Sequence, residues 1–145
     1  MNKILKHLAS IRLIAVLALC TCAAQALAGS VVVVGASSTI GPTSKSDIIK
    51  VFLGKKKALP GASVVPIDQD DGNGARLDFY NNTVKKTQAQ LKSYWSRLIF
   101  TGKGQAPQVV GNDGDVKSMV ATNPNLIGYI DEASVDASVK VIYKP

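Results

Sequence analysis

Segment 69–76 has residue types that can bind a negatively charged oxygen cluster. Gly72-Asn73-Gly74 precedes an expected helix start. The first amides of a helix have no intrahelical partner and lie at the positive end of its dipole, so they can hold an oxyanion. Arg76 would add positive charge, whereas Asp70 and Asp71 would oppose a dianion. An ordinary turn with a helix cap is the alternative interpretation.

A second loop, Gly35-Ala36-Ser37-Ser38-Thr39, follows the first expected strand. Ligands of open α/β sheets bind outside the carboxyl ends of strands, and three hydroxyl groups there could donate to an oxyanion. An ordinary polar loop is again the alternative. The candidate ligand-binding residues are therefore Ser37, Ser38, Thr39, Gln69, Gly72, Asn73, Gly74 and Arg76.

The N-terminal segment is typical of a secretory signal peptide. Lys3, Lys6 and Arg12 precede an apolar run at 13–24, and Ala26-Leu27-Ala28 has the small-x-small pattern of a cleavage site. We expect cleavage after Ala28. A membrane anchor is the alternative, but the run is shorter than the roughly 20 residues that span a bilayer. A lipoprotein anchor at Cys20 or Cys22 is also open, although neither cysteine follows the small residue that such processing prefers.

Removal of residues 1–28 would leave 117 residues, enough for one domain, and would lower the net charge from +7 to +4. This mild charge does not favour nucleic-acid binding. Both cysteines and the only histidine, His7, would leave with the signal peptide. Thiolate nucleophiles, histidine-based triads and ordinary zinc sites are then excluded. We expect no enzyme, no metal and no cofactor, and no membrane-embedded segment after cleavage.

Strand and helix patterns alternate along the rest of the chain, which indicates an α/β fold with a mixed or mostly parallel sheet covered on both faces. The expected strands are 30–34, 63–67, 126–130 and 139–143. The expected helices begin after a Ser44 cap, contain 77–84, span 88–100 after a Thr87–Gln90 capping box, and follow an Asp113 cap up to Asn123-Pro124.

Three other features have a functional and a structural interpretation. Lys55-Lys56-Lys57 could attract anions or an acidic partner, but a short charge run more often faces water at a helix end. Tyr94-Trp95 could stack on a ligand, but its spacing with Leu91 and Leu98 favours core packing. Two Asp pairs at expected helix entries are typical of caps rather than of acid–base chemistry.

Several stretches resemble the phosphate-type family of periplasmic substrate-binding proteins, the soluble components of ABC importers. The stretches are 48–55, 64–69, 94–95, 100–104 with Pro107, and 123–124 with 127–129. The series is similar to the C-terminal-half lobe of these two-lobe proteins, and to small secreted proteins that consist of one such lobe. The resemblance implies a three-layer lobe of the type 2 periplasmic-binding-protein-like fold over 29–145, with a mixed sheet of about five strands flanked by helices.

In the larger relatives, the loop that corresponds to 69–76 has an arginine, two intervening residues and then Gly-Ser-Gly-Thr. The arginine, serine and threonine of that loop contact the phosphate. Here Gln69 stands at the arginine position, Asn73 at the serine and Ala75 at the threonine, while Gly72 and Gly74 match. Two ligand groups are therefore absent and one is altered. The relatives also close two lobes around the ligand, and one lobe offers half of that cleft.

The resemblance implies a periplasmic solute-binding protein for phosphate or a related oxyanion, with an ABC permease or a homodimer partner. A single-lobe interaction module that no longer binds a ligand is the alternative hypothesis. It is motivated by the changes at Gln69, Asn73 and Ala75. A hydrolase or transferase is a third hypothesis, but no constellation for serine–lysine or carboxylate chemistry stands out.

Overall fold

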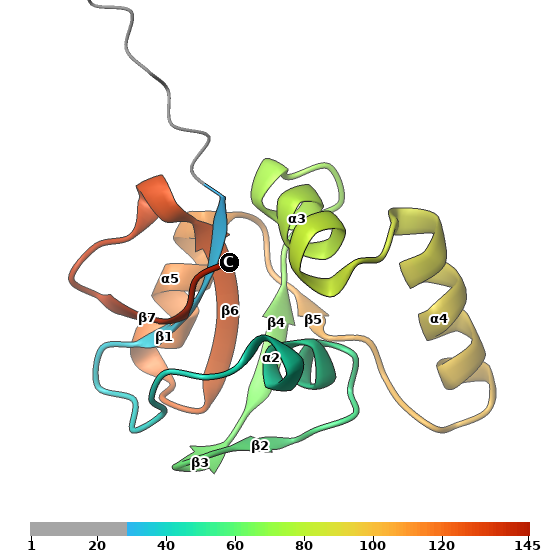
Figure 1. Cartoon of the computed structure of the whole chain (residues 1–145), viewed down its shortest axis with the longest axis horizontal. Coiled ribbons are helices and arrows are strands. Elements are labelled where there is room, and N and C mark those ends of the chain that lie inside the picture. The colour runs from blue at the N-terminus through green and yellow to red at the C-terminus, as the bar shows by residue number, and fades with distance from the viewer. Residues whose placement is uncertain (1–28) are drawn as a thin grey trace, which may run out of the picture.

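The computed structural model describes residues 29–145, so the expected signal peptide at 1–28 lies outside the described residues. A five-stranded sheet with the order β5-β4-β6-β1-β7 forms the centre (Figure 1). Its strands are β1 (Ser30–Gly35), β4 (Val65–Asp68), β5 (Gln108–Val109), β6 (Leu126–Asp131) and β7 (Val139–Tyr143). A small separate hairpin pairs β2 (Ala58–Leu59) with β3 (Ala62–Ser63). The helices are α2 (Lys45–Phe52), α3 (Gly74–Asp78), η1 (Phe79–Val84), α4 (Gln88–Phe100), α5 (Asp113–Thr122) and η2 (Glu132–Ser134).

The strands run in two directions. β4 is parallel to both β5 and β6, whereas β1 is antiparallel to β6 and β7. The predicted mixed sheet is therefore confirmed. As a consequence, the carboxyl ends of β4, β5 and β6 meet at one edge of the sheet, and the carboxyl end of β1 lies at the opposite edge.

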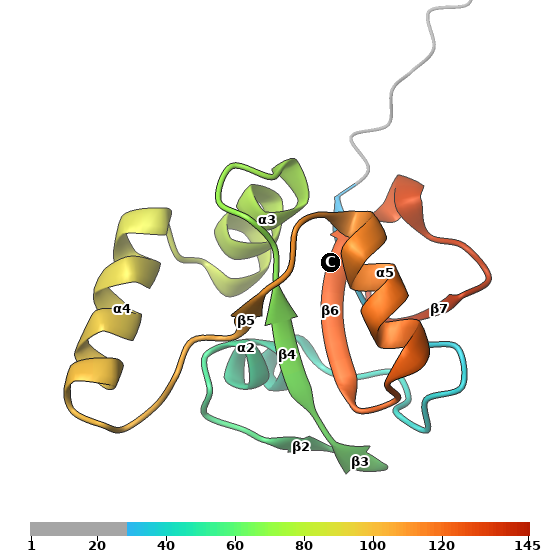
Figure 2. The same cartoon turned by 180° about the vertical axis from the view of Figure 1, so that it is seen from behind.

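Helices cover both faces of this sheet, as Figures 1 and 2 show from opposite sides. Alternation along β1 divides its valines, because successive side chains of a strand point to opposite faces. Val32 and Val34 pack with α2, η1 and Trp95 of α4, whereas Val31 and Val33 pack with Val116 and Val120 of α5. The expected three-layer lobe with a five-stranded mixed sheet is confirmed.

The helix caps mostly follow the sequence patterns. Ser44 caps α2, and Thr87 with Gln90 forms the predicted capping box of α4. The predicted cap of α5 is wrong by one residue. Asn112 accepts hydrogen bonds from the first amides of α5, and Asp113 is the first residue of that helix. The Asp113 carboxylate instead accepts a hydrogen bond from the Asp131 amide of β6.

Two expected elements differ in extent. The strand predicted at 63–67 is two strands, because Ala62–Ser63 pairs with Ala58–Leu59 around the Pro60-Gly61 turn before β4 begins at Val65. The helix predicted around 77–84 begins earlier, at Gly74, and continues into the π-helical segment η1. This earlier start places the first turn of α3 directly at the end of the loop after β4.

Asp78 at the end of α3 fixes the start of β1. Its Oδ2 accepts hydrogen bonds from the Ser30 amide at 2.7 Å and the Ser30 hydroxyl at 2.6 Å, and Asn82 donates to Oδ1. Partial burial acts to raise the pKa of Asp78, but these hydrogen bonds outweigh it and the pKa lies below its ordinary value. The carboxylate form therefore holds β1 against α3.

We expect Asp78→Asn to lower the unfolding free energy at neutral pH by about 1–3 kcal/mol, because a half-buried carboxylate that accepts three hydrogen bonds is lost. A depressed pKa gives stabilisation that is present above the unfolded value and is lost as the pH falls through the folded value. The wild type should therefore lose more stability than the variant below about pH 4. Urea unfolding across pH 3–7 measures this. Asp70→Asn is the control, since Asp70 is exposed. If the unfolding free energy depends on pH in the same way in the wild type and in Asp78→Asn, the prediction is wrong.

Candidate functional site

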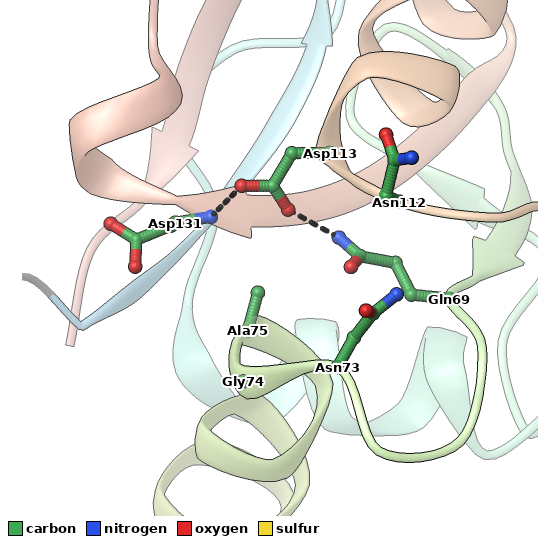
Figure 3. A pocket seen from close by; sticks show the side chains of 7 residues that line it. All are labelled: Gln69, Asn73, Gly74, Ala75, Asn112, Asp113 and Asp131. Atoms are coloured by element: carbon green, nitrogen blue, oxygen red, sulfur yellow. Dashed lines mark hydrogen bonds between the residues drawn. The ribbon is translucent and has the colours of Figure 1, made fainter.

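An open cavity of about 410 Å³ lies at the edge of the sheet where β4 and β6 end and where α3 and α5 begin (Figure 3). Its lining residues are Gln69, Asn73, Gly74, Ala75, Asn112, Asp113 and Asp131. Parallel strands with helices starting at their carboxyl ends are the usual place for ligands in α/β proteins, because helix N-termini point there. The candidate loop 69–76 thus forms one wall of this pocket.

The first amides of α3 lack a side-chain cap. Asn73 occupies the cap position, but its side chain makes no cap hydrogen bond and instead donates from Nδ2 to the Gly111 carbonyl at 2.7 Å. Within residues 29–145, the amides of Gly74, Ala75 and Arg76 have no hydrogen-bond acceptor. Gly74 and Ala75 line the pocket, so donors that a cap would normally satisfy are left at this site.

Gly72 makes the turn that leads into α3. Its φ is +93°, a left-handed conformation that glycine adopts at low cost, and a Cβ there would meet nothing within 4 Å. Gly72 does not line the pocket. Its conformation rather than its contacts is therefore its contribution to the loop.

Gln69 and Asp113 close the floor of the pocket. Gln69 is buried, and its Nε2 donates to Asp113 Oδ1 and to the Tyr129 carbonyl, both at 2.8 Å. Asp113 Oδ2 accepts from the Asp131 amide at 3.1 Å and from the Ser134 hydroxyl at 2.7 Å. The donors of Gln69 are thus used within the protein, in contrast to the ligand contact that its position implied.

The charge of the pocket comes from two carboxylates, Asp113 and Asp131, and no basic side chain is among its lining residues. Backbone amides and the dipoles of α3 and α5 supply the positive potential. Asn112 already caps Gly114 and Asp115 of α5, which leaves α3 as the richer source of donors.

Arg76 points away from this pocket into the protein. Its Nε lies 3.2 Å from Asp68 Oδ1 and its Nη1 lies 2.8 Å from Asp71 Oδ1, and Nη1 also donates to Gln88 Oε1. Burial acts to lower the pKa of Arg76, but Asp68 outweighs it and the pKa rises. The guanidinium stays charged and serves the buried network, so it is not placed to bind a ligand in the pocket.

Two buried tyrosines complete the network around Asp68. The Tyr80 hydroxyl donates to Asp68 Oδ2 at 3.0 Å, and the Tyr129 hydroxyl donates to Asp68 Oδ1. Burial and the Asp68 charge raise the pKa of both phenols, so they remain protonated donors. This network fixes the end of β4, where the pocket loop begins.

The loop of Ser37, Ser38 and Thr39 lies at the opposite edge of the sheet, because β1 is antiparallel to β6. Ser38 is buried and its hydroxyl donates to the Pro124 carbonyl at 2.8 Å, and Thr39 donates to the Gly61 carbonyl at 3.3 Å. Ser37 is exposed. The structure does not bring these hydroxyl groups together with loop 69–76.

Sequence reasoning did not assign Asn112, Asp113 and Asp131 to the pocket. Asp113 had been interpreted only as a helix cap. The signal that could have found them is topological, since each lies at the end of a strand or the start of a helix on the same edge. In the part of the chain that the structure describes, no group of three or more His, Cys, Asp and Glu residues could hold a metal ion. None of the helices described is long and apolar enough to cross a membrane.

The chain matches no protein-family model and no curated protein. It is similar to solved structures of larger binding proteins. A putative phosphate ABC transporter substrate-binding protein with bound phosphate from Clostridium perfringens has a TM-score of 0.61 and 24% identity, with 79% of this chain and 44% of that chain covered. An ABC-type phosphate transport receptor from Vibrio cholerae has a TM-score of 0.60 and 19% identity, with 79% and 45% covered.

PstS from Borrelia burgdorferi has a TM-score of 0.54 and 18% identity, with 79% of this chain and 46% of that chain covered. The chain therefore spans less than half the length of each of these three proteins. The predicted resemblance to one lobe of the phosphate-type binding proteins is confirmed for the fold.

Proposed function

We propose that this protein is an exported solute-binding protein that holds phosphate or a related tetrahedral oxyanion in the pocket between α3 and α5. The observation that carries the proposal is the set of uncapped amides at Gly74 and Ala75, which line an open pocket at the carboxyl ends of parallel strands. The similarity to a substrate-binding protein with bound phosphate supports the same ligand class.

The absence of a basic side chain in the lining sets the expected strength of binding. Backbone amides and helix dipoles would have to offset the repulsion from Asp113 and Asp131. We expect weaker phosphate binding than a site with an arginine would give. A second lobe is not part of residues 29–145, so a homodimer is the proposed means of covering the open pocket.

Binding rather than catalysis is the proposed activity. Residues 29–145 contain neither histidine nor cysteine, and the similar solved structures are named as substrate-binding proteins or receptors. We propose the periplasm as the location and an ABC permease as the membrane partner. The leader-like residues 1–28 support the location, and the resemblance supports both the location and the partner.

Isothermal titration of the purified protein with phosphate, sulfate, phosphonate and arsenate tests the ligand class. Gly74→Pro is the sharpest variant, because proline at the first helical position removes one amide donor and keeps the helix. The preceding Asn73 has a ψ of 134°, which suits a residue before proline. We expect phosphate binding to weaken by about tenfold or more, since a hydrogen bond to a charged group contributes about 1.5–3 kcal/mol.

Gly74→Ala is the matched control, because it retains the amide and a Cβ at this position meets nothing within 4 Å. Its affinity should stay close to that of the wild type. Absence of heat and of any thermal shift at millimolar oxyanion contradicts the proposal. Equal affinities for Gly74→Pro and Gly74→Ala would show that any binding occurs elsewhere.

A second candidate function is an interaction module that kept the lobe and lost the small ligand. The engagement of Gln69 with Asp113 and Tyr129 favours it, because these donors are no longer available to an oxyanion. This candidate expects no oxyanion binding together with a defined dimer or heteromeric complex. Light scattering of the purified protein and of its mixtures with periplasmic proteins measures this, and a monomer that forms no complex contradicts it.

A further inference from the structure

A second and larger hollow, the α2–α4 groove, lies between α4 and the rest of the lobe. It has a volume of about 1260 Å³ and is bounded by the end of α2, the start of β4, the inner side of α4 and the segment 102–108. Figure 1 shows α4 standing beside the sheet, joined to it by this segment. The groove shares no lining residue with the α3–α5 pocket.

The lining of the groove carries one sign of charge. Lys55, Lys56, Lys57, Arg97 and Lys103 line it, and no aspartate or glutamate does. Lys56 is paired with Asp47 at 2.8 Å. For the other four cations, no carboxylate within residues 29–145 lies within salt-bridge distance. Several cations that share low-dielectric walls focus a positive potential, so the groove attracts anions.

The sequence around α4 strengthens this polarity. No acidic residue occurs between Asp78 and Asp113, whereas this stretch contains five lysines and arginines. Two carboxylates, Asp113 and Asp131, line the α3–α5 pocket instead. The two hollows of one small lobe therefore differ in charge and would select different ligands.

The floor of the groove is apolar. Val51, Leu53, Val64, Trp95 and Leu98 contribute to it. Val65 and Ile99 also line it and are 55% and 56% exposed, so they extend this apolar surface to solvent. An occupant that matches both features needs negative groups for the lysines and apolar groups for the floor.

We propose that the α2–α4 groove binds an acidic segment of a partner polypeptide that carries apolar side chains between its carboxylates. The volume exceeds the roughly 300–1,000 Å³ of ordinary small-molecule sites and suits an extended chain. Charge complementarity selects the acidic class, because an acidic segment neutralises cations that have no partner within the lobe.

Other occupants fit the groove less well. Residues 1–28 of this chain contain Lys3, Lys6 and Arg12 and no acidic residue, so the same cations would repel them. A second copy carries net positive charge. An inorganic polyphosphate would pair with the lysines but would leave Val65 and Ile99 in water.

The single tryptophan, Trp95, lies in the groove and reports on it directly. The probe is a synthetic 12-residue peptide that alternates Glu and Leu and contains no aromatic residue. We expect saturable binding to the purified protein, seen as a change in Trp95 emission and weakened by salt. A peptide of Glu and Ser and a peptide of Lys and Leu should each bind at least tenfold more weakly.

Matched variants locate the binding. A triple variant with Lys55→Gln, Lys57→Gln and Arg97→Gln should bind the acidic peptide about tenfold or more weakly than the wild type. The control is a second triple variant with Lys45→Gln, Lys85→Gln and Lys92→Gln. It has the same change of charge outside the groove, so its affinity for the peptide should change by less than about twofold. Ile99→Gln, at an exposed position, should weaken binding without loss of the fold, which circular dichroism checks.

Several outcomes would overturn the proposal. The first is that the acidic peptide shows no saturable binding, and the second is that both triple variants lose affinity for it equally. The third is that polyphosphate or phosphatidylglycerol vesicles displace the peptide as well as unlabelled peptide does. A dimer that the groove variant abolishes would assign the surface to a second copy instead. Phosphate titration of the same variants keeps this test separate from the α3–α5 pocket, which none of these substitutions touches.

Discussion

Arg76→Met is expected to lower the unfolding free energy by about 3–5 kcal/mol, because it leaves the buried Asp68 carboxylate without its cation. The side chains of Arg76 and Asp68 are 8% and 5% exposed, and Arg76 Nε lies 3.2 Å from Asp68 Oδ1. Tyr80 and Tyr129 also donate to Asp68, but neither brings a positive charge. Methionine fills similar space without replacing the lost charge.

Urea unfolding followed by circular dichroism measures the effect of Arg76→Met. Arg97→Met is the control, since Arg97 is exposed and should change the unfolding free energy by less than about 0.5 kcal/mol. Arg76→Lys should fall between the two, because lysine keeps the charge but not the guanidinium fork. A loss below about 1 kcal/mol in Arg76→Met would mean that the buried pair is not a main support of the lobe.

Gly35→Ala is expected to destabilise the lobe by about 3 kcal/mol or more, since it forces β1 away from α5. An added Cβ would lie 2.2 Å from the Val120 carbonyl oxygen and 3.4 Å from the Ala121 Cα. Backbone atoms of a helix cannot turn aside as the end of a side chain can. The strand and the helix would have to separate, which opens the core of Val31, Val33, Val116 and Val120.

Gly41→Ala is the matched control for Gly35→Ala, because a Cβ at Gly41 meets nothing within 4 Å. Its melting temperature should equal that of the wild type or exceed it slightly, since alanine restricts the unfolded chain. Differential scanning calorimetry compares the three proteins. A Gly35→Ala melting temperature close to that of Gly41→Ala would show that α5 moves away without cost.

Most elements of the fold could be predicted because their signals are local. The valines of β1, the Thr87–Gln90 capping box and the stop at Asn123-Pro124 depend on near neighbours alone. The cap of α5 was missed because Asn112 and Asp113 both suit a cap, and a distant strand decided between them. Asn112 caps the helix, and Asp113 accepts a hydrogen bond from the Asp131 amide of β6.

The candidate site was predictable in part. Loop 69–76 lies at a pocket, as its glycines and its place after a strand indicated. The orientation of its side chains was not predictable, because the contacts of Gln69 and Arg76 come from Asp113 and Asp68, respectively 44 and 8 residues away along the chain. Gln69 and Arg76 were interpreted as possible ligand groups, and the structure instead shows both in internal hydrogen bonds.

The sequence alone determined most of the strands and helices, though not the short strands β2 and β5. It also determined the small charge of residues 29–145 and their lack of thiol and imidazole chemistry. These properties depend on composition and on neighbours within a few residues. Only the tertiary structure decided the direction of β1, which carries Ser37, Ser38 and Thr39 to the far edge of the sheet. It also decided that the lysines after α2 share one groove with Arg97 and Lys103, while Asp113 and Asp131 line a separate pocket, since long-range packing sets which side chains meet.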